Sequence, residues 1–185
     1  MAWAAGLGLV DLRGPGHRQE TETYIQSLCG PVFGKRETVN AGVGEARAAI
    51  TALVHAYAAR IDAGDLDGVA SLFENAEWRS GDSDEPVLRG AGAIRTIFER
   101  VQLYEGTPRT THQISNLTID VGADGRTASS VCTFVVLQGV EMGAPIEVIL
   151  TGVYEDRFEL VESAWRFAAR RVRPLLLGDL RRHYR

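Results

Sequence analysis

The sequence contains few cysteines, and those present fit no metal site. Cys29 and Cys132 are the only two among 185 residues, and they lie far apart without the ligand spacing that a metal requires. Cys132 falls in an apolar alternating run, so we expect a buried, reduced thiol there. With so little cysteine, a cytoplasmic location is the default expectation.

Long apolar runs and an excess of positive charge are also missing. No stretch approaches the roughly 20 apolar residues that span a membrane, and residues 1–10 lack the basic start of a signal peptide. The net charge of −4 provides no general attraction to nucleic acid or anionic membranes, so we expect neither as a partner. One basic cluster is interpreted as a solvated last strand and tail: Arg166, Arg170, Arg171, Arg173, Arg181, Arg182 and Arg185.

The motifs of several enzyme classes are absent as well. The chain has no Gly-rich phosphate-binding loop, no His/Cys cluster with metal-ligand spacing and no nucleophile elbow. We therefore expect no metal ion and no organic cofactor. What is present is an ordinary globular composition, 45% hydrophobic and 24% charged, in a length that suits one domain.

The chain divides into three parts. Residues 1–44 are punctuated by glycine and have no long periodic run, which predicts an N-terminal extension that is partly ordered at best. An alternative is that the natural start lies downstream of this stretch. Residues 45–173 carry regular patterns and are predicted to form the domain, and residues 174–185 form a basic C-terminal tail.

Helical periodicity comes first within the domain. Apolar residues recur at helical spacing until Gly64 ends the first helix, and Asp65 is a good N-cap for a second short helix. Short strands are expected at residues 77–79 and 86–88. A third helix is expected over residues 90–103.

After Pro108 the period changes to two, which is typical of strands, and Asp124-Gly125 is a tight-hairpin dipeptide. Three helices followed by an antiparallel meander form an α+β pattern, with the helices packed against one face of a curved sheet. Such a sheet leaves an apolar cavity for a small molecule, and its other face favours a homodimer or higher homo-oligomer. The long strands are expected at residues 109–121, 127–139, 145–159 and 164–173.

Three side chains indicate chemistry. Asp62 lies at the edge of the apolar stripe near a helix C-terminus, where burial and the dipole raise a carboxyl pKa unless a partner compensates. His112 lies in a polar stretch at the start of a core strand, and a histidine held by a carboxylate is a competent general acid/base. Tyr57 precedes Asp62 by five residues on the same helix. The alternatives are a solvated acid, a structural histidine and a core aromatic.

Residues 57–68, with the sequence YAARIDAGDLDG, resemble the first-helix signature of the SnoaL-like, nuclear transport factor 2-like superfamily. The likeness continues in order through Phe73, Trp78, Gly90 and Ile94 to residues 111–116, THQISN. It covers residues 45–173 and implies a cone-shaped, cystatin-like α+β fold. Because this fold hosts many unrelated activities, the resemblance is informative for fold and weak for function.

Ketosteroid isomerases look similar around the first helix, and the resemblance would put their oxyanion-binding tyrosine on Tyr57. Their catalytic base would fall near Ser80 or Gly81, and their second acid near Tyr154. None of these positions offers a carboxylate, which argues against steroid isomerisation by that mechanism.

Scytalone dehydratase and the bile acid 7α-dehydratases resemble this chain better at the site. Their Asp/His pair falls on Asp62 and His112, and the catalytic tyrosine of the bile acid enzymes falls on Tyr57. The tyrosine that precedes the aspartate in the scytalone enzyme is Ile61 here, so its water-holding arrangement does not carry over.

These observations together predict a cofactor-independent lyase or isomerase of the dehydratase type, acting on a hydrophobic small molecule. His112, oriented by Asp62, would abstract a proton α to a carbonyl and return it to the leaving hydroxyl, while Tyr57 would stabilise the enolate oxygen. The expected substrate-binding residues are Trp78, Leu88, Phe98, Asn116, Phe134, Tyr154 and Trp165.

The alternative is a non-catalytic module that uses the same fold to bind a ligand or to dimerise. A hydrogen-bonded Asp62–His112 pair inside a closed pocket would favour the enzyme, and a solvent-facing pair would favour the module. Epoxide hydrolysis on this fold needs an Asp–Arg–Asp set, which the sequence does not identify.

Overall fold

The computed structural model describes residues 41–84 and 87–185. The predicted extension therefore lies almost entirely outside the described residues, as does Cys29. Within the described ranges no helix is both long enough and apolar enough to cross a membrane. The helical elements are α2 (Ala41–Asp62), α3 (Leu66–Ser71), α4 (Gly90–Arg95) and a 3-10 turn (Thr96–Phe98).

Helix α2 forms because its apolar residues recur every three or four positions, which places them on one face. It begins at Ala41, four residues before the predicted start. Gly64 ends the turn after it with a φ of +79°, and a Cβ there would lie 2.0 Å from the carbonyl oxygen of Gly106. Only glycine fits such a position. The buried face of the helix comprises Ala46, Ile50, Val54, Tyr57, Ala58 and Ile61.

Helix α3 begins where the sequence predicts. The carboxylate of Asp65 accepts a hydrogen bond from the backbone N–H of Gly68 at 2.9 Å, which caps the helix. The third helix is shorter than predicted, because α4 ends at Arg95 and continues only as the 3-10 turn. Beyond this turn the backbone of Val101 pairs with Tyr184, so tertiary pairing with the C-terminal segment replaces the helix.

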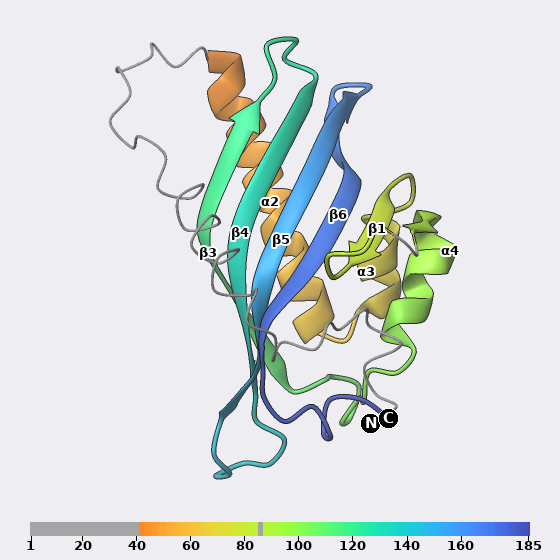
Figure 1. The fold of residues 1–185 in the computed structure, drawn as a ribbon, viewed down its shortest axis with the longest axis vertical. Helices are drawn as coiled ribbons and strands as arrows, with labels where there is room; N and C mark the ends of the chain where they lie inside the picture. The colour runs from red at the N-terminus through yellow and green to blue at the C-terminus, as the bar shows by residue number, and fades with distance from the viewer. Residues whose placement is uncertain (1–40, 85–86) are drawn as a thin grey trace.

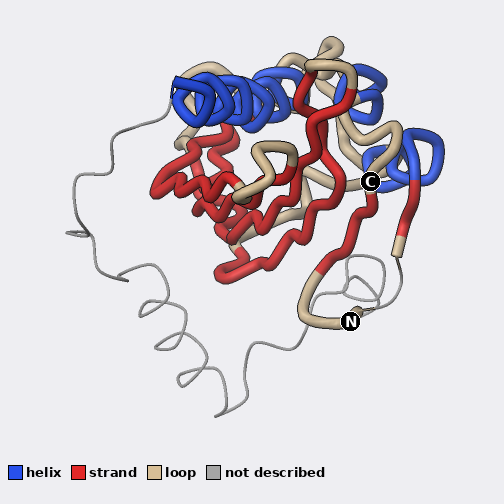
Figure 2. The backbone as a smooth tube through the Cα atoms, turned by 90° about the horizontal axis from the view of Figure 1, so that it is seen from above, coloured by secondary structure: helices blue, strands red, loops and turns tan. Residues whose placement is uncertain are grey.

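The sheet has six strands in the order β2-β1-β6-β5-β4-β3 (Figure 1). The four long strands form the predicted antiparallel meander, while β1 joins β6 in parallel and pairs with β2 in antiparallel fashion. The helices cover one face of this curved sheet (Figure 2), which confirms the predicted α+β class and the cystatin-like architecture. The strands are β1 (Glu77–Ser80), β2 (Leu88–Arg89), β3 (Thr110–Val121), β4 (Thr127–Gln138), β5 (Glu147–Val161) and β6 (Ala164–Leu177).

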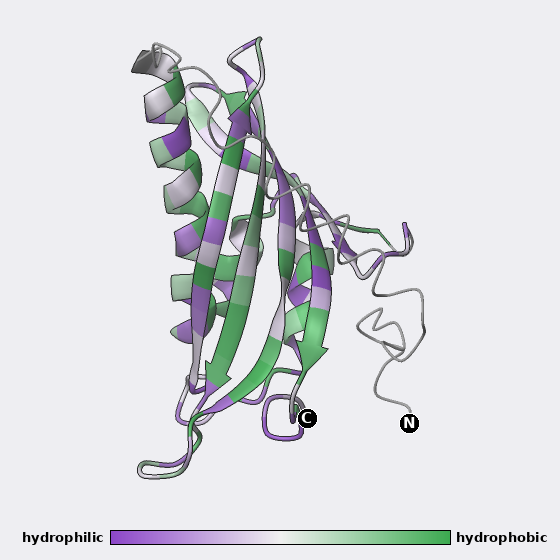
Figure 3. Cartoon of the chain, turned by 60° about the vertical axis from the view of Figure 1, so that its left-hand side comes forward, coloured by the Kyte–Doolittle hydropathy of each residue, from purple (hydrophilic) through white to green (hydrophobic). Residues whose placement is uncertain are grey.

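Hydrophobic and hydrophilic residues alternate along the long strands (Figure 3), because successive side chains point to opposite faces of a sheet. In β4 every second residue is buried, including Cys132. Burial raises the pKa of the Cys132 thiol to about 12, so it remains protonated, as the sequence predicts.

The pairing register of the long strands shifts at several places. One shift lies beside Gly152 on β5, where a Cβ would meet the ring of Phe134 at 2.6 Å and the carbonyl oxygen of Arg173 at 2.5 Å. The absence of a Cβ at Gly152 therefore leaves the space that the Phe134 ring occupies. That ring stacks on Tyr154 with centroids 4.1 Å apart and planes 11° apart.

The C-terminal segment lies in the lower part of the molecule as drawn in Figure 1. Strand β6 extends to Leu177, and the chain then folds back against residues 100–104. The N–H of Gln102 donates to the carbonyl of His183 at 2.8 Å, and the Tyr104 hydroxyl donates to the carbonyl of Arg182 at 2.7 Å. Residues 174–185, predicted to be a basic tail, thus contact the body of the domain.

Candidate functional site

A cavity of ≈ 80 Å³ lies between the C-terminal half of α2 and the end of the sheet where β4 and β6 finish. A single buried water needs only about 10–15 Å³ of such space, so this cavity can hold a larger molecule. Its apolar lining consists of Ile61, Ile97, Phe98, Val101, Phe134, Val136, Ile149, Leu150, Val172, Pro174, Leu177 and Leu180. Side chains that can form hydrogen bonds there are Tyr57, Trp78, Ser80, His112, Tyr154, His183 and Tyr184.

Asp62 and His112 meet at the wall of this cavity, although 50 residues separate them in the chain. The Nδ1 atom of His112 lies 2.6 Å from Oδ1 of Asp62, and the backbone N–H of His112 donates to Oδ2 at 2.7 Å. The Thr110 hydroxyl donates to Oδ1 at 2.8 Å. The side chain of His112 is only 5% exposed and that of Asp62 is 20% exposed, so most of the pair is shielded from solvent.

The carboxylate of Asp62 determines how the imidazole is presented. Burial alone would raise the pKa of Asp62, but the hydrogen bonds from His112 and its electrostatic interaction with the carboxylate outweigh burial and lower that pKa below its ordinary value. His112 is therefore the partner that compensates for the burial of this carboxylate. An ionised carboxylate only accepts hydrogen bonds, so Nδ1 of His112 carries a proton and Nε2 is the nitrogen left for chemistry.

Tyr57 and Tyr154 form the aromatic side of the site. The Tyr57 ring lies 6.3 Å from the His112 ring and 5.5 Å from the Tyr154 ring, centroid to centroid. Burial raises the pKa of the Tyr57 phenol, and the charge of Arg170 together with a hydrogen bond from Tyr154 offsets part of that rise. The phenol therefore stays protonated and remains a hydrogen-bond donor on a residue that lines the cavity.

Arg170 is buried behind these two tyrosines. Its guanidinium carbon lies 4.2 Å from the centroid of each ring, and two of its nitrogens donate to Asp156 at 2.7 Å each. The prediction of a solvated arginine cluster is wrong at this residue, which is 1% exposed. The physical reason is strand register, because Asp156 on β5 pairs directly with Arg170 on β6.

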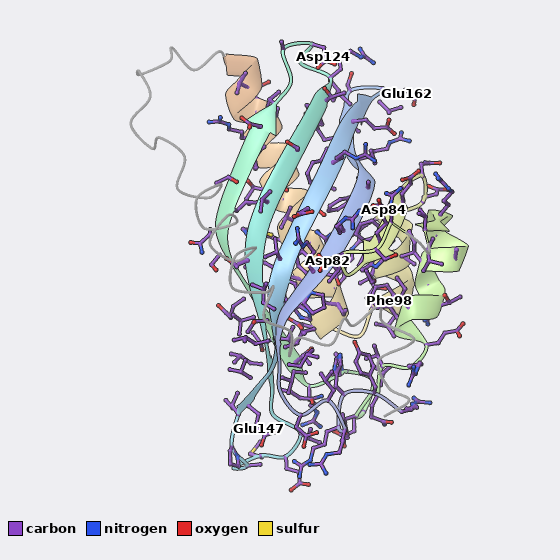
Figure 4. All side chains as sticks on the ribbon, viewed as in Figure 1. Asp82, Asp84, Phe98, Asp124, Glu147 and Glu162 are labelled. Carbon is purple, nitrogen blue, oxygen red and sulfur yellow. The ribbon has the colours of Figure 1, made fainter. Side chains whose placement is uncertain are left out.

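The neighbouring arginines differ from Arg170, because their side chains are partly exposed and pair with acidic side chains that are exposed themselves. Arg171 donates to Asp84 at 2.6 Å, and Arg173 lies 2.9 Å from Asp82. Figure 4 labels both aspartates in the loop after β1, beside β6. These partly exposed pairs fit the solvated interpretation of the cluster.

The structure brings most of the predicted site residues together. Tyr57, His112, Trp78, Phe98, Phe134 and Tyr154 all line the cavity, and Asp62 lies behind His112. Three predicted substrate-binding residues are not among its lining residues: Leu88, Asn116 and Trp165.

Those three residues lie elsewhere for identifiable reasons. Leu88 is in the short strand β2 at the edge of the sheet, and Asn116 is exposed at a bulge in β3, where it donates to Thr133 at 2.9 Å. Trp165 pairs with Leu160 near the β5–β6 turn. That turn carries Glu162 in Figure 4, at the end of the sheet opposite Glu147 and the cavity.

Two cavity residues were missed because they lie in the predicted tail. His183 and Tyr184 come from the C-terminal segment, and their rings lie 4.5 Å apart. His183 is 6% exposed, and its Nδ1 has no hydrogen-bond partner among the described residues. Burial, aided by the nearby His112, lowers the pKa of His183 to about 4. The apolar residues Leu180 and Tyr184, close to His183 in the sequence, could have indicated that this segment packs against the domain.

The low pKa of His183 predicts a pH-dependent stability. Between its ordinary pKa of 6.5 and about 4, the unfolded chain binds a proton that the folded chain excludes, so stability falls as the pH is lowered. We expect the wild type to lose roughly 2–3 kcal/mol more than His183→Asn between about pH 7 and pH 4.5. Urea unfolding of both proteins at each pH measures this. If the wild type and His183→Asn lost the same free energy of unfolding, His183 would not be buried in its neutral form.

Metal-ligating side chains do not cluster in the part of the chain that the structure describes. No group of three or more His, Cys, Asp or Glu side chains there is arranged to hold an ion. The polar groups of the cavity are instead suited to hydrogen bonding and proton transfer.

Comparison with known proteins finds a family and several similar folds. The model of the SnoaL-like domain matches residues 43–171. The comparison with curated proteins finds no match. A proposed scytalone dehydratase from Novosphingobium aromaticivorans is 22% identical with a TM-score of 0.59, covering 75% of this chain and 89% of that chain.

Two further solved structures share the fold. A protein of unknown function from Mycobacterium tuberculosis is 25% identical with a TM-score of 0.57, covering 72% of this chain and 79% of its own. A hexachlorocyclohexane dehydrochlorinase from Novosphingobium barchaimii is 17% identical with a TM-score of 0.57. The match covers 74% of this chain and 91% of that chain.

Proposed function

This chain belongs to the SnoaL-like domain family, and from that premise we propose that it is a cofactor-independent lyase of the dehydratase type. Its substrate is an apolar, ring-containing small molecule with a hydroxyl group β to a carbonyl. The observation that supports this most is the Asp62–His112 pair, joined at 2.6 Å on the wall of an apolar cavity. A shielded imidazole with one free nitrogen is the arrangement that proton abstraction requires.

His112, Asp62 and Tyr57 each have one role in the proposed reaction. Nε2 of His112 removes the proton α to the carbonyl, and Asp62 stabilises the resulting imidazolium. The phenol of Tyr57 donates a hydrogen bond to the enolate oxygen as charge develops on it. The enolate then re-forms the carbonyl and expels the β-hydroxyl, which takes the proton from His112 and leaves as water. One C–H bond and one C–O bond break, and one C=C bond forms.

A non-catalytic ligand-binding module is the competing function. The test set by the sequence was whether Asp62 and His112 meet inside a pocket or face solvent, and the observed contact favours the enzyme. Two structures with a similar fold are described as a proposed dehydratase and a dehydrochlorinase, names that both denote elimination reactions. An isomerase that returns the proton to another carbon would use the same three side chains. The homodimer expected from the sheet stays a prediction.

We predict that the purified protein dehydrates a bicyclic β-hydroxy ketone, the β-hydroxy derivative of α-tetralone, to α-naphthol. Loss of water from this probe gives an aromatic, fluorescent product, so fluorescence and mass spectrometry follow the same event. General acid–base catalysis at a positioned histidine contributes about 10²–10⁴-fold over the reaction in buffer. Binding of a panel of such ketones without any acceleration would favour the module and contradict the proposal.

A further inference from the structure

The cavity has a second histidine on its wall, which the proposed mechanism does not use. His183 lines the cavity together with His112, but it comes from the C-terminal segment and is 94% shielded from solvent. Its Nδ1 is buried and has no hydrogen-bond partner in residues 41–84 and 87–185. A buried imidazole nitrogen without a partner costs free energy, and an oxygen atom of a ligand in the cavity could supply the missing hydrogen bond.

The position of His183 is held by the backbone around it. Its carbonyl accepts a hydrogen bond from the N–H of Gln102 at 2.8 Å, and its own N–H donates to the carbonyl of Leu180 at 3.0 Å. On either side, the carbonyl of Arg182 accepts from Tyr104, and the N–H of Arg185 donates to the carbonyl of Arg100 at 2.9 Å. These contacts fix the backbone around His183, and none of them involves its ring nitrogens.

The imidazole has the chemistry of a neutral hydrogen-bonding group. With a pKa of about 4 it carries no charge near neutral pH, so one ring nitrogen donates and the other accepts. His183 and His112, the proposed base, both line the same small cavity. A neutral donor and acceptor on the wall of a largely apolar cavity favours an oxygen atom on an otherwise apolar ligand.

We propose that His183 is a substrate-binding residue that hydrogen-bonds a hydroxyl or carbonyl oxygen of the molecule held between it and His112. This assignment rests on the proposed function, because it deepens the description of the same site. The ligand class that follows is an oxygenated, ring-sized apolar molecule rather than a bare hydrocarbon. A site built to hydrogen-bond an oxygen discriminates against the analogue that lacks it, since its buried polar group is then left unpaired.

The experiment compares α-naphthol with naphthalene, which differ only in the hydroxyl. Dissociation constants from ligand fluorescence are measured for the wild type, His183→Phe and His183→Asn. Phenylalanine keeps a ring of similar size without a hydrogen bond, whereas the asparagine amide keeps a polar group near the Nδ1 position. We expect His183→Phe to weaken α-naphthol binding roughly 5–10-fold and His183→Asn to weaken it less than about 2-fold. Naphthalene should bind all three proteins alike.

Three results would overturn the assignment: equal α-naphthol affinity of wild type and His183→Phe, equal weakening of both ligands, or no saturable α-naphthol binding to the wild type. NMR of the wild type with isotope-labelled histidine provides a readout that needs no variant to fold. There, α-naphthol should shift the His183 ring nitrogens and naphthalene should not. His183-dependent binding without dehydration of the hydroxytetralone would contradict the proposed function alone.

Discussion

Replacing His112 with alanine is expected to lower kcat/KM for the hydroxytetralone by about 10²–10⁴-fold. No other side chain in the described cavity combines a free imidazole nitrogen with a carboxylate partner, because His183 has no such partner and is held neutral by burial. Steady-state kinetics with α-naphthol fluorescence measures the loss. Circular dichroism and the unfolding midpoint establish that the variant is folded.

Two further variants sharpen this result. Asp62→Asn removes the carboxylate charge but keeps the size of the side chain, so the imidazolium loses its stabilisation and kcat should fall with little change in KM. His55→Ala is the matched control, since His55 lies exposed on the same helix as Asp62 and should leave activity unchanged. Activity within a factor of about 3 of wild type in His112→Ala would remove the histidine from the mechanism, because general acid–base catalysis is worth far more.

Removing the carboxylate of Asp156 is expected to destabilise the domain by about 3–5 kcal/mol. Arg170 and Asp156 both have side chains with 0% exposure, and Arg170 donates to both carboxylate oxygens. In Asp156→Asn the amide group offers N–H where the guanidinium needs an acceptor, so a buried charge is left without full compensation. Urea unfolding followed by tryptophan fluorescence measures the change.

The same substitution should also lower activity, because Arg170 packs on the rings of Tyr57 and Tyr154. The matched control is Glu155→Gln. Glu155 is the residue before Asp156 on β5, and its substitution breaks a partly exposed ion pair with Arg173 on β6. A surface pair of this kind contributes less than about 1 kcal/mol. Equal effects of the two substitutions would contradict the account of Arg170 as a buried charge that depends on one partner.

Much of the secondary structure could be predicted because local patterns decide it. The stripe from Ile50 to Ile61 and the cap at Asp65 depend on neighbours within a few residues, and so does the hairpin at Asp124-Gly125. The third helix was predicted too long because its C-terminal part pairs with Tyr184, far along the chain. A periodic pattern carries no information about such a partner.

The site was predictable in part. Asp62 and His112 were paired by residue type and by family resemblance, and the 2.6 Å contact agrees with that pairing. Asn116 and Trp165 were assigned to the cavity because polar and aromatic residues on core strands suit one, yet both lie outside it. Which end of a long strand faces a cavity depends on where the helices and the C-terminal segment cover the sheet.

By itself, the sequence determined the α+β class, the helical stripe, the strand alternation and the residue types that acid–base chemistry needs. Each of these follows from side-chain periodicity or from intrinsic chemistry, which act over a few residues. Only the tertiary structure decided that Arg170 is buried against Asp156 and that His183 lines the cavity. Strand register and the return of the C-terminal segment set both, because burial and hydrogen-bond partners depend on contacts between distant parts of the chain.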